Sequence, residues 1–170
     1  MERKNETNYI VNINKREQFF SLKANQVENV KSFYFENQLI DDKFAKNLSK
    51  LSLEYLDNFY IINCNIYEPN ILSSVFYIKN LGFVDCGLFF DEIKVILKWI
   101  LDWKNIDTLD LSGNNLGKNQ YEFFKWLNRN IWSNVYIKQF IISDNNFTTD
   151  FKVKMLEHNE RFKSFDNISL

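Results

Sequence analysis

The sequence predicts an α/β fold in which short parallel strands and returning helices alternate in stacked units. Three observations support it: an apolar pattern recurs, its copies lie at similar distances along the chain, and apolar residues at helical spacing lie between them. The pattern reads apolar-x-x-apolar-x-apolar-x-x-(Asn, Cys or Gln)-x-apolar, and successive copies begin 22 to 31 residues apart. The five copies are Val30-Phe33-Phe35-Gln38-Ile40, Leu56-Phe59-Ile61-Cys64-Ile66, Ile78-Leu81-Phe83-Cys86-Leu88, Ile106-Leu109-Leu111-Asn114-Leu116 and Ile137-Phe140-Ile142-Asn145-Phe147.

Each copy is too short to bury its own apolar side, so the core has to come from stacking. Pattern positions four and six are two residues apart on a strand and therefore point to the same side. Strands stacked at roughly 4.8 Å would form a parallel sheet with these positions in two columns. The columns are Phe33, Phe59, Leu81, Leu109, Phe140 and Phe35, Ile61, Phe83, Leu111, Ile142.

Apolar residues three and four apart predict helices on the opposite side of the sheet. The second unit is the shortest and contains the sole proline, Pro69, so its segment opposite the strand should span only one or two turns. The helical stretches are Phe44-Leu48-Leu51, Ile93-Ile96-Leu97-Ile100 and Phe124-Leu127-Ile131. Tryptophans on this side are expected to pack between helices, or to form a second interface if they are exposed: Trp99, Trp103, Trp126 and Trp132.

Both ends of a stacked array need a cover. Residues 1–29 are interpreted as an N-terminal cap, with an edge strand over 9–13 and a helix started by Asn14 and Glu17. Residues 148–170 are interpreted as the last helix and the C-terminal cap. Its expected apolar residues are Phe151, Met155 and Leu156, with Phe162 and Phe165 resembling a truncated sixth copy.

These copies carry a resemblance to a known family. From about residue 30 onward the chain resembles leucine-rich-repeat proteins, and residues 106–116 match the family pattern at every fixed position. Copies near 28 residues long, with helices opposite the strands, are similar to the ribonuclease-inhibitor-like class. The resemblance implies a right-handed leucine-rich-repeat solenoid over 1–170, with the five copies over 30–147, parallel strands on the concave face and helices on the convex face.

The ninth pattern position follows each strand, where the chain turns. A side-chain amide there can bond backbone groups that the turn leaves unpaired. The resemblance implies that cysteine can fill the same position as a small buried thiol; the alternative is a disulfide, metal or redox role, for which the chain has no Cys-x-x-Cys pair. We expect a structural turn ladder: Gln38, Cys64, Cys86, Asn114 and Asn145.

Composition favours an ordered domain without a charge-driven partner. The 170 residues are 45% apolar and 17% aromatic, with a net charge of −1. Acidic and basic residues are mixed along the chain, which argues against nucleic acid or an anionic membrane as partner. No stretch approaches the length of a transmembrane helix, and the charged N-terminus does not resemble a signal peptide. Two cysteines without a paired motif point weakly to a reducing compartment, the cytoplasm.

The richness in Asn, Lys, Ile and Phe is similar to that of leucine-rich-repeat effectors from Legionella-like intracellular bacteria. This resemblance implies translocation into a host cell without an N-terminal signal peptide, and a eukaryotic host protein as partner. Glu157 and Glu160 followed by the apolar end Ile168-Ser-Leu170 are compatible with a C-terminal export signal. Surface charge on a last helix is the alternative explanation.

Pattern positions three, five and seven alternate away from the core, so they should line the face that solenoids use for binding. Tyrosine is favoured there because it brings a large area and one polar tip. Gly82 would leave a notch in the tyrosine column, although Tyr34 packing on Tyr60 would also simply stabilise the sheet. The candidate partner-binding residues are Tyr34, Glu36, Tyr60, Ile62, Gly82, Val84, Asp85 and Asp110.

Acidic residues should form a row along the edge of this face, as a solvated rim or as ligands for a basic partner or calcium: Glu36, Asp85, Asp110 and Asp144. The sole histidine, His158, stands on a charged helix end, where we expect a solvated side chain and no base or ligand. No phosphate-binding glycine motif is present. We therefore expect no catalytic residue, no metal and no cofactor.

The sequence indicates a non-enzymatic protein-interaction module, expected to be a monomer and a secreted bacterial effector. One alternative is an intracellular scaffold or regulator in its own cell. A more remote one is a GTPase-activating role through Arg129 or Arg161, since some proteins of this repeat class offer an arginine to a nucleotide.

Overall fold

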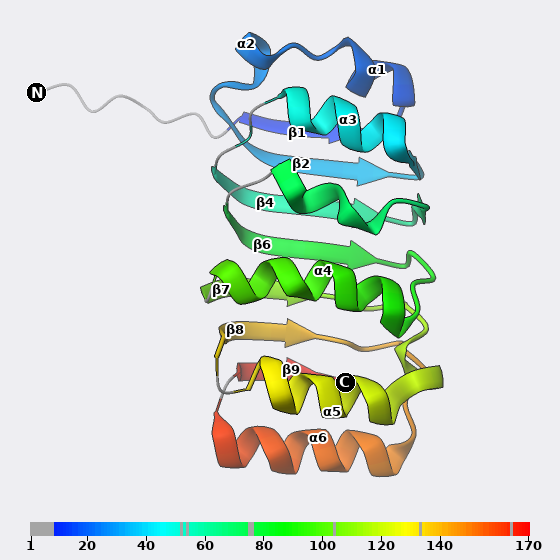
Figure 1. The fold of residues 1–170 in the computed structure, drawn as a ribbon, viewed down its shortest axis with the longest axis vertical. Coiled ribbons are helices and arrows are strands. Elements are labelled where there is room, and N and C mark those ends of the chain that lie inside the picture. Colours follow the sequence, from blue (N-terminus) through cyan, green and yellow to red (C-terminus); the bar gives the residue numbers. More distant parts are fainter. Residues whose placement is uncertain are drawn as a thin grey trace, which may run out of the picture.

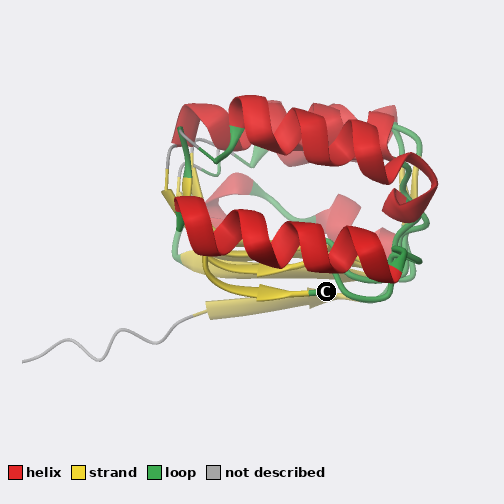
Figure 2. Ribbon diagram, turned by 90° about the horizontal axis from the view of Figure 1, so that it is seen from below, coloured by secondary structure: helices red, strands yellow, loops and turns green. Residues whose placement is uncertain are grey.

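The computed structural model describes residues 9–51, 53, 55–74, 77–103, 105–132, 134–163 and 165–170. A parallel sheet forms one layer, and helices cover one of its faces (Figure 1, Figure 2). The strands are β1 (Tyr9–Ile13), β2 (Val30–Glu36), β3 (Leu39–Ile40), β4 (Tyr55–Ile62), β5 (Asn65–Ile66), β6 (Tyr77–Val84), β7 (Asn105–Asp110), β8 (Tyr136–Ile141) and β9 (Phe165–Ser169). The helices are α1 (Arg16–Ser21), α2 (Ala24–Val27), α3 (Asp42–Lys50), α4 (Phe90–Trp103), α5 (Gln120–Asn130) and α6 (Thr149–Phe162), with 3₁₀ segments η1 (Pro69–Ser74) and η2 (Leu116–Asn119).

The main sheet contains seven parallel strands in the order β1-β2-β4-β6-β7-β8-β9. Its neighbours follow one another along the chain, apart from the short β3 and β5, which pair with each other. The pairing register matches pattern position to pattern position: Phe33 lies opposite Phe59, and Leu109 opposite Phe140. The predicted α/β class with a parallel sheet is thereby confirmed.

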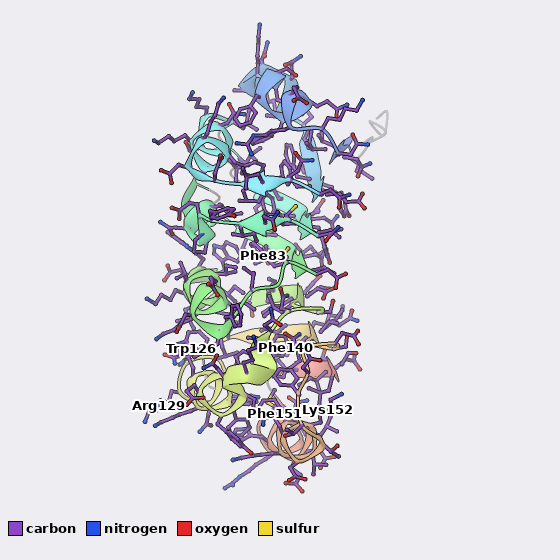
Figure 3. The ribbon with its side chains drawn as sticks, turned by 90° about the vertical axis from the view of Figure 1, so that its right-hand side faces the viewer. Phe83, Trp126, Arg129, Phe140, Phe151 and Lys152 are labelled. Carbon is purple, nitrogen blue, oxygen red and sulfur yellow. The ribbon has the colours of Figure 1, made fainter. Side chains whose placement is uncertain are left out.

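Both predicted core columns are buried between the sheet and the helices. All ten side chains at pattern positions four and six are 0% exposed. Figure 3 shows Phe83 and Phe140 between the two layers. Burying a side chain of this size stabilises the fold by roughly 1.5–3 kcal/mol, so the columns are the main cohesive element.

The helix layer follows the predicted stretches. Asp41 caps α3 by accepting a hydrogen bond from the Phe44 backbone N–H at 2.9 Å, and Phe44 and Leu48 are buried below it. The buried residues of α4 include Ile93, Ile96, Leu97 and Ile100, and those of α5 include Phe124 and Leu127. The second unit has only the six-residue 3₁₀ segment η1, which confirms the expected short segment.

The N-terminal cap contains the predicted edge strand, since Val11 and Ile13 of β1 pair with Phe33 and Phe35 of β2. The predicted helix start is wrong. Lys15, rather than Asn14, is the N-cap residue of α1, and its side chain makes no capping hydrogen bond. Packing holds this helix instead: Phe19 is 0% exposed and stacks on Phe44, with ring centroids 4.3 Å apart.

At the other end, α6 buries Phe151 and Met155 but leaves Leu156 45% exposed, so the predicted apolar stripe is wrong at Leu156. Lys163 adopts a left-handed conformation (φ 49°) that ends the helix. Strand β9 then begins at Phe165, which pairs with Ile137, and Ile168 pairs with Phe140. The sixth copy therefore starts at Phe165; the side chain of residue 162 lies outside the described residues.

Candidate functional site

Seven of the eight candidate partner-binding residues lie on the sheet face opposite the helices, in two rows across the strands; Asp85 follows β6. In one row Tyr34 pairs with Tyr60, Tyr60 with Gly82, and Gly82 with Asp110. In the other, Glu36 pairs with Ile62 and Ile62 with Val84. Register thus brings together residues from β2, β4, β6 and β7.

Tyr34 on β2 and Tyr60 on β4 form a stacked pair in the amino-terminal part of this face. Their ring centroids are 5.4 Å apart with an interplanar angle of 15°. Burial, followed by the nearby Asp110 carboxylate and Tyr34, raises the pKa of Tyr60 to about 12. Its hydroxyl is therefore a neutral hydrogen-bonding group at physiological pH. We refer to Tyr34, Tyr60, Ile62 and Val84 as the aromatic patch.

The expected notch at Gly82 is wrong, because the Tyr60 ring fills it. A Cβ atom added to Gly82 would lie 2.2 Å from Tyr60 Cδ1, far inside contact distance. Glycine is present there so that the ring can lie flat against the strand backbone. The patch is therefore a closed surface on which a partner would pack, and it has no recess at Gly82 for a partner side chain.

The expected row of carboxylates is uneven: Glu36 and Asp110 are the last residues of β2 and β7, whereas Asp85 and Asp144 lie beyond the ends of their strands. Asp110 lies in the strand beside Gly82, and its Oδ1 accepts hydrogen bonds from the Ser112 backbone N–H at 3.0 Å and Ser112 Oγ at 2.7 Å. Asp85 and Asp144 instead follow their strands, with φ of 53° and 56°. Among the described residues, no three acidic, histidine or cysteine side chains gather as a metal site.

The left-handed turn position was missed from the sequence. Every described strand of the five copies is followed at pattern position eight by a residue with positive φ, which Asn, Asp and Gly tolerate best. These residues are Asn37, Asn63, Asp85, Gly113 and Asp144. The signal was present, because only these residue types occur at that position in all five copies.

The turn ladder connects each unit to the one before it. Asn114 Nδ2 donates to the carbonyl oxygens of Phe83 at 2.7 Å and Leu111 at 2.8 Å, while its Oδ1 accepts the Leu88 N–H at 3.0 Å. Asn145 repeats these contacts one unit later, with Leu111 O and Leu116 N–H.

The thiols occupy the same ladder with fewer contacts. Cys86 Sγ donates toward Val84 O at 3.2 Å and Ile61 O at 3.4 Å, and Cys64 Sγ toward Ile62 O at 3.2 Å. Both cysteines are free. Burial raises the pKa of Cys64, and it raises the pKa of Cys86 to about 12. Gln38 turns back on its own strand and donates to Glu36 O at 2.8 Å.

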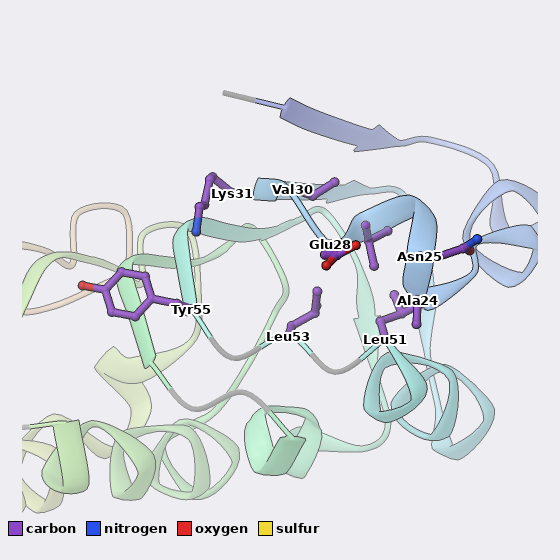
Figure 4. A pocket seen from close by; sticks show the side chains of 9 residues that line it. Ala24, Asn25, Glu28, Val30, Lys31, Leu51, Leu53 and Tyr55 are labelled. Atoms are coloured by element: carbon purple, nitrogen blue, oxygen red, sulfur yellow. The ribbon is translucent and has the colours of Figure 1, made fainter. Parts of the chain in front are cut away.

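Outside the sheet face, the described residues line cavities that include two of about 500 Å³. One of about 520 Å³ lies where α2 approaches the amino ends of β2 and β4 (Figure 4). Its lining is Ala24, Asn25, Val27, Glu28, Val30, Lys31, Leu51, Leu53 and Tyr55. The second, of about 500 Å³, lies between η1 and α4 beside Trp99, whose Nε1 donates to Asn70 Oδ1 at 3.2 Å.

The tryptophans pack between units. Trp132 is 4% exposed, and Trp99, Trp103 and Trp126 are half-buried. Trp103 contacts Tyr77 edge-on, with centroids 6.2 Å apart. No tryptophan in the described part of the chain is fully exposed, so these rings help to pack the helix layer.

The expected solvation of His158 is wrong, because its ring is packed in the C-terminal cap. It stacks on Trp132 at 4.1 Å and meets Phe124 edge-on at 5.2 Å. Burial lowers the pKa of His158, and Arg161 and Lys154 lower it further. Arg129 is exposed on the outer side of the helix layer (Figure 3), and Arg161 lies in the last turn of α6.

No protein-family model matches the chain, and no curated protein sequence is significantly similar to it. In the described residues, no helix combines the length and the apolarity needed to cross a bilayer.

Proposed function

We propose that the chain is a leucine-rich-repeat solenoid of the ribonuclease-inhibitor-like class. Support comes from neighbouring parallel strands that follow chain order, from core columns in register, and from a turn residue that bonds the preceding unit at every step from Cys64 to Asn145. In such a solenoid each unit packs only on its neighbours, and the sheet face is free to bind.

We propose further that the protein is a non-enzymatic interaction module that binds a partner protein through the aromatic patch. The observation that carries this proposal is the stacked Tyr34–Tyr60 pair, half-buried on a face that no described helix covers. Its rings are already held by the sheet, so binding would cost little side-chain entropy. Tyrosines in such settings act as interface anchors.

The partner we propose is a host protein met by a bacterial effector, with Glu36 and Asp85 orienting it from the exposed rim. The effector assignment rests on the compositional resemblance, and with it the expected cytoplasmic location in the producing or host cell. The supposed export tail has a structural role as well, because Ile168 and Ser169 belong to β9. An export test should therefore substitute Glu157 and Glu160, which are exposed on α6, rather than truncate the sheet.

The test is affinity capture from eukaryotic lysate with wild type, Tyr34→Ala/Tyr60→Ala and the control Tyr121→Ala. Tyr121 is 59% exposed on α5, so Tyr121→Ala also removes a tyrosine side chain but does so outside the aromatic patch. Each patch substitution should weaken binding by about 1–3 kcal/mol. A partner retained equally by wild type and the folded double variant would disprove the proposed site; thermal melting establishes that the variant is folded.

A further inference from the structure

A column of charges crosses the sheet near the amino ends of its strands. Each member follows the first core residue of its strand, and the sign changes at every step from β2 to β9. The members of this charge column are Lys31, Asp57, Lys79, Asp107, Lys138 and Asp166. Six positions in register with strict alternation form a pattern that core packing does not require.

Contacts within the sheet use only part of this charge. Lys79 Nζ lies 3.5 Å from Asp107 Oδ2, with both side chains nearly half exposed, and it is the only ion pair that the column forms within the described residues. Lys31 Nζ lies 5.9 Å from the Tyr55 ring centroid, and the Asp166 carboxylate, acting on the Tyr136 hydroxyl, raises the pKa of Tyr136. The remaining cross-strand neighbours leave their charges available to a partner.

Exposed tyrosines accompany the charge column. Tyr55 and Tyr136 stand one residue before the first core position of their strands and are 54% and 45% exposed. Tyr77 stacks on Tyr55, with ring centroids 4.9 Å apart. Exposed tyrosine rings can anchor a partner, and the neighbouring charges can fix the orientation in which it binds.

We propose that a second copy of this chain binds along this margin, related by a two-fold axis that reverses the order of the strands. Reversal places Lys31 against Asp166 of the second copy, Asp57 against Lys138, and Lys79 against Asp107. Every charge meets its opposite, and by symmetry each contact occurs twice. Alignment in register without reversal would set like charges against each other, so opposite-charge pairing at all six positions requires the reversed, two-fold arrangement.

The same operation places Tyr55 against Tyr136 of the second copy, which covers the two most exposed rings of the margin. All strands of the main sheet point the same way in Figure 1, so their amino ends line a single margin. Two such margins share a strand spacing of about 4.8 Å and can run side by side. The aromatic patch lies further along the strands and stays open, so the dimer presents two patches at once.

The experiment is sedimentation equilibrium at low ionic strength, with protein up to about 300 μM, on four chains. Wild type should show a concentration-dependent dimer. Lys138→Asp sets two aspartates against each other and should raise the dimer dissociation constant at least about tenfold. Asp57→Lys/Lys138→Asp restores every intermolecular contact and should return to within about threefold of wild type.

The matched control is Asp107→Lys/Lys138→Asp, which carries the same net charge as the restoring double variant and makes two kinds of repulsive contact, each of them twice. It should associate at least as weakly as the single variant. Within one sheet the preference is opposite, because this control keeps more unlike neighbours than the restoring double variant does. A merely intramolecular ladder would therefore favour the control in thermal melting and leave the association of both unchanged.

Disulfide trapping tests the alignment separately. A mixture of Tyr55→Cys and Tyr136→Cys should cross-link, whereas each variant alone should not, because its own cysteines would lie three strand spacings apart, about 14 Å. A monomeric wild type over the whole concentration range, or equal association of the two double variants, would overturn the proposal. Circular dichroism verifies that each variant is folded.

Discussion

The amino-terminal and carboxyl-terminal halves of the molecule close the same turn with different chemistry. Cys64 and Cys86 each share one S–H between two carbonyl oxygens, and Cys64 Sγ also accepts the Gln38 N–H at 3.2 Å. Asn114 and Asn145 each donate to three carbonyl oxygens and accept a backbone N–H through Oδ1. A thiol has one weak donor, while an amide has two donors and an acceptor.

The backbone supplies what the thiols lack. After the turns of the first two units, β3 and β5 pair in parallel, and Asn65 N–H donates to Gln38 O at 3.0 Å. In the other half Asn115 N–H, at the pattern position of Asn65, donates to Leu88 O at 2.8 Å, and the asparagine oxygens accept the N–H groups of Leu88 and Leu116. Both kinds of turn residue donate a hydrogen bond to a carbonyl oxygen of the preceding strand. The other hydrogen bonds of the turn are divided differently between side chain and backbone in the two halves.

The largest expected effect on the difference between the two halves is that of Asn114→Ala. The amide is 2% exposed, and its loss leaves Phe83 O, Leu111 O and Leu88 N–H without these partners. We expect a loss of roughly 2–4 kcal/mol, measured as the free energy of unfolding in urea. The control is Asn115→Ala, which removes one peripheral bond to Gly87 O and should cost less than about 1 kcal/mol. Equal losses would contradict the amide ladder.

A second test concerns the amino-terminal half and its tyrosine stack. Gly82→Ala introduces a Cβ into the Tyr60 ring and should destabilise the fold by about 1–3 kcal/mol. Removing the ring relieves the clash, so Gly82→Ala/Tyr60→Ala should be destabilised by less than the sum of the single variants. Urea unfolding of all three variants measures the difference; simple additivity would show that the ring does not press on Gly82.

Cys86→Ala should cost only about 1 kcal/mol, because it removes one weak donor and a small buried volume. Burial raises the pKa of Cys86 to about 12, so the thiol should react with iodoacetamide far more slowly in the folded protein than in urea at pH 8. A loss as large as that of Asn114→Ala would remove the distinction between the two halves, and rapid alkylation of folded protein would contradict the burial of the thiol.

The repeated elements were predictable because their causes are local. Leu81 and Leu109 face the core through strand alternation, and the short η1 follows from the short second unit and Pro69. The left-handed position was equally local and could have been predicted, since Asn37 and Gly113 share a pattern position.

The candidate site was harder to predict because its details depend on neighbours distant in sequence. Whether Gly82 is a notch depends on how the Tyr60 ring lies, and that ring is held by Tyr34 on another strand. Spacing places Asp110 on the open face but does not show that Ser112 occupies its carboxylate. The surroundings of His158 depend on which side of α6 meets Trp132.

The smallest expected effect is an acid sensitivity confined to the carboxyl-terminal cap, where His158 packs against Trp132 and Phe124. Burial lowers the pKa of His158 below the ordinary value of 6.5, so the unfolded chain binds the proton more readily. Stability from the neutral ring is fully present above pH 6.5 and is lost as the pH falls below 6.5 through the lowered folded-state pKa. Thermal melting between pH 7.5 and 5 measures this loss.

The matched variant is His158→Phe, which keeps an aromatic ring between Trp132 and Phe124 but cannot be protonated. Its melting temperature should fall less than that of wild type over the same pH range, because the carboxylates titrate alike in both proteins and their contribution cancels. Amide hydrogen exchange should place the acid-induced loosening in α6 and β9 and leave β2 and β4 protected, since the described amino-terminal half contains no histidine. Parallel pH profiles of the two proteins would mean that the ring titrates as freely in the cap as it does in the unfolded chain.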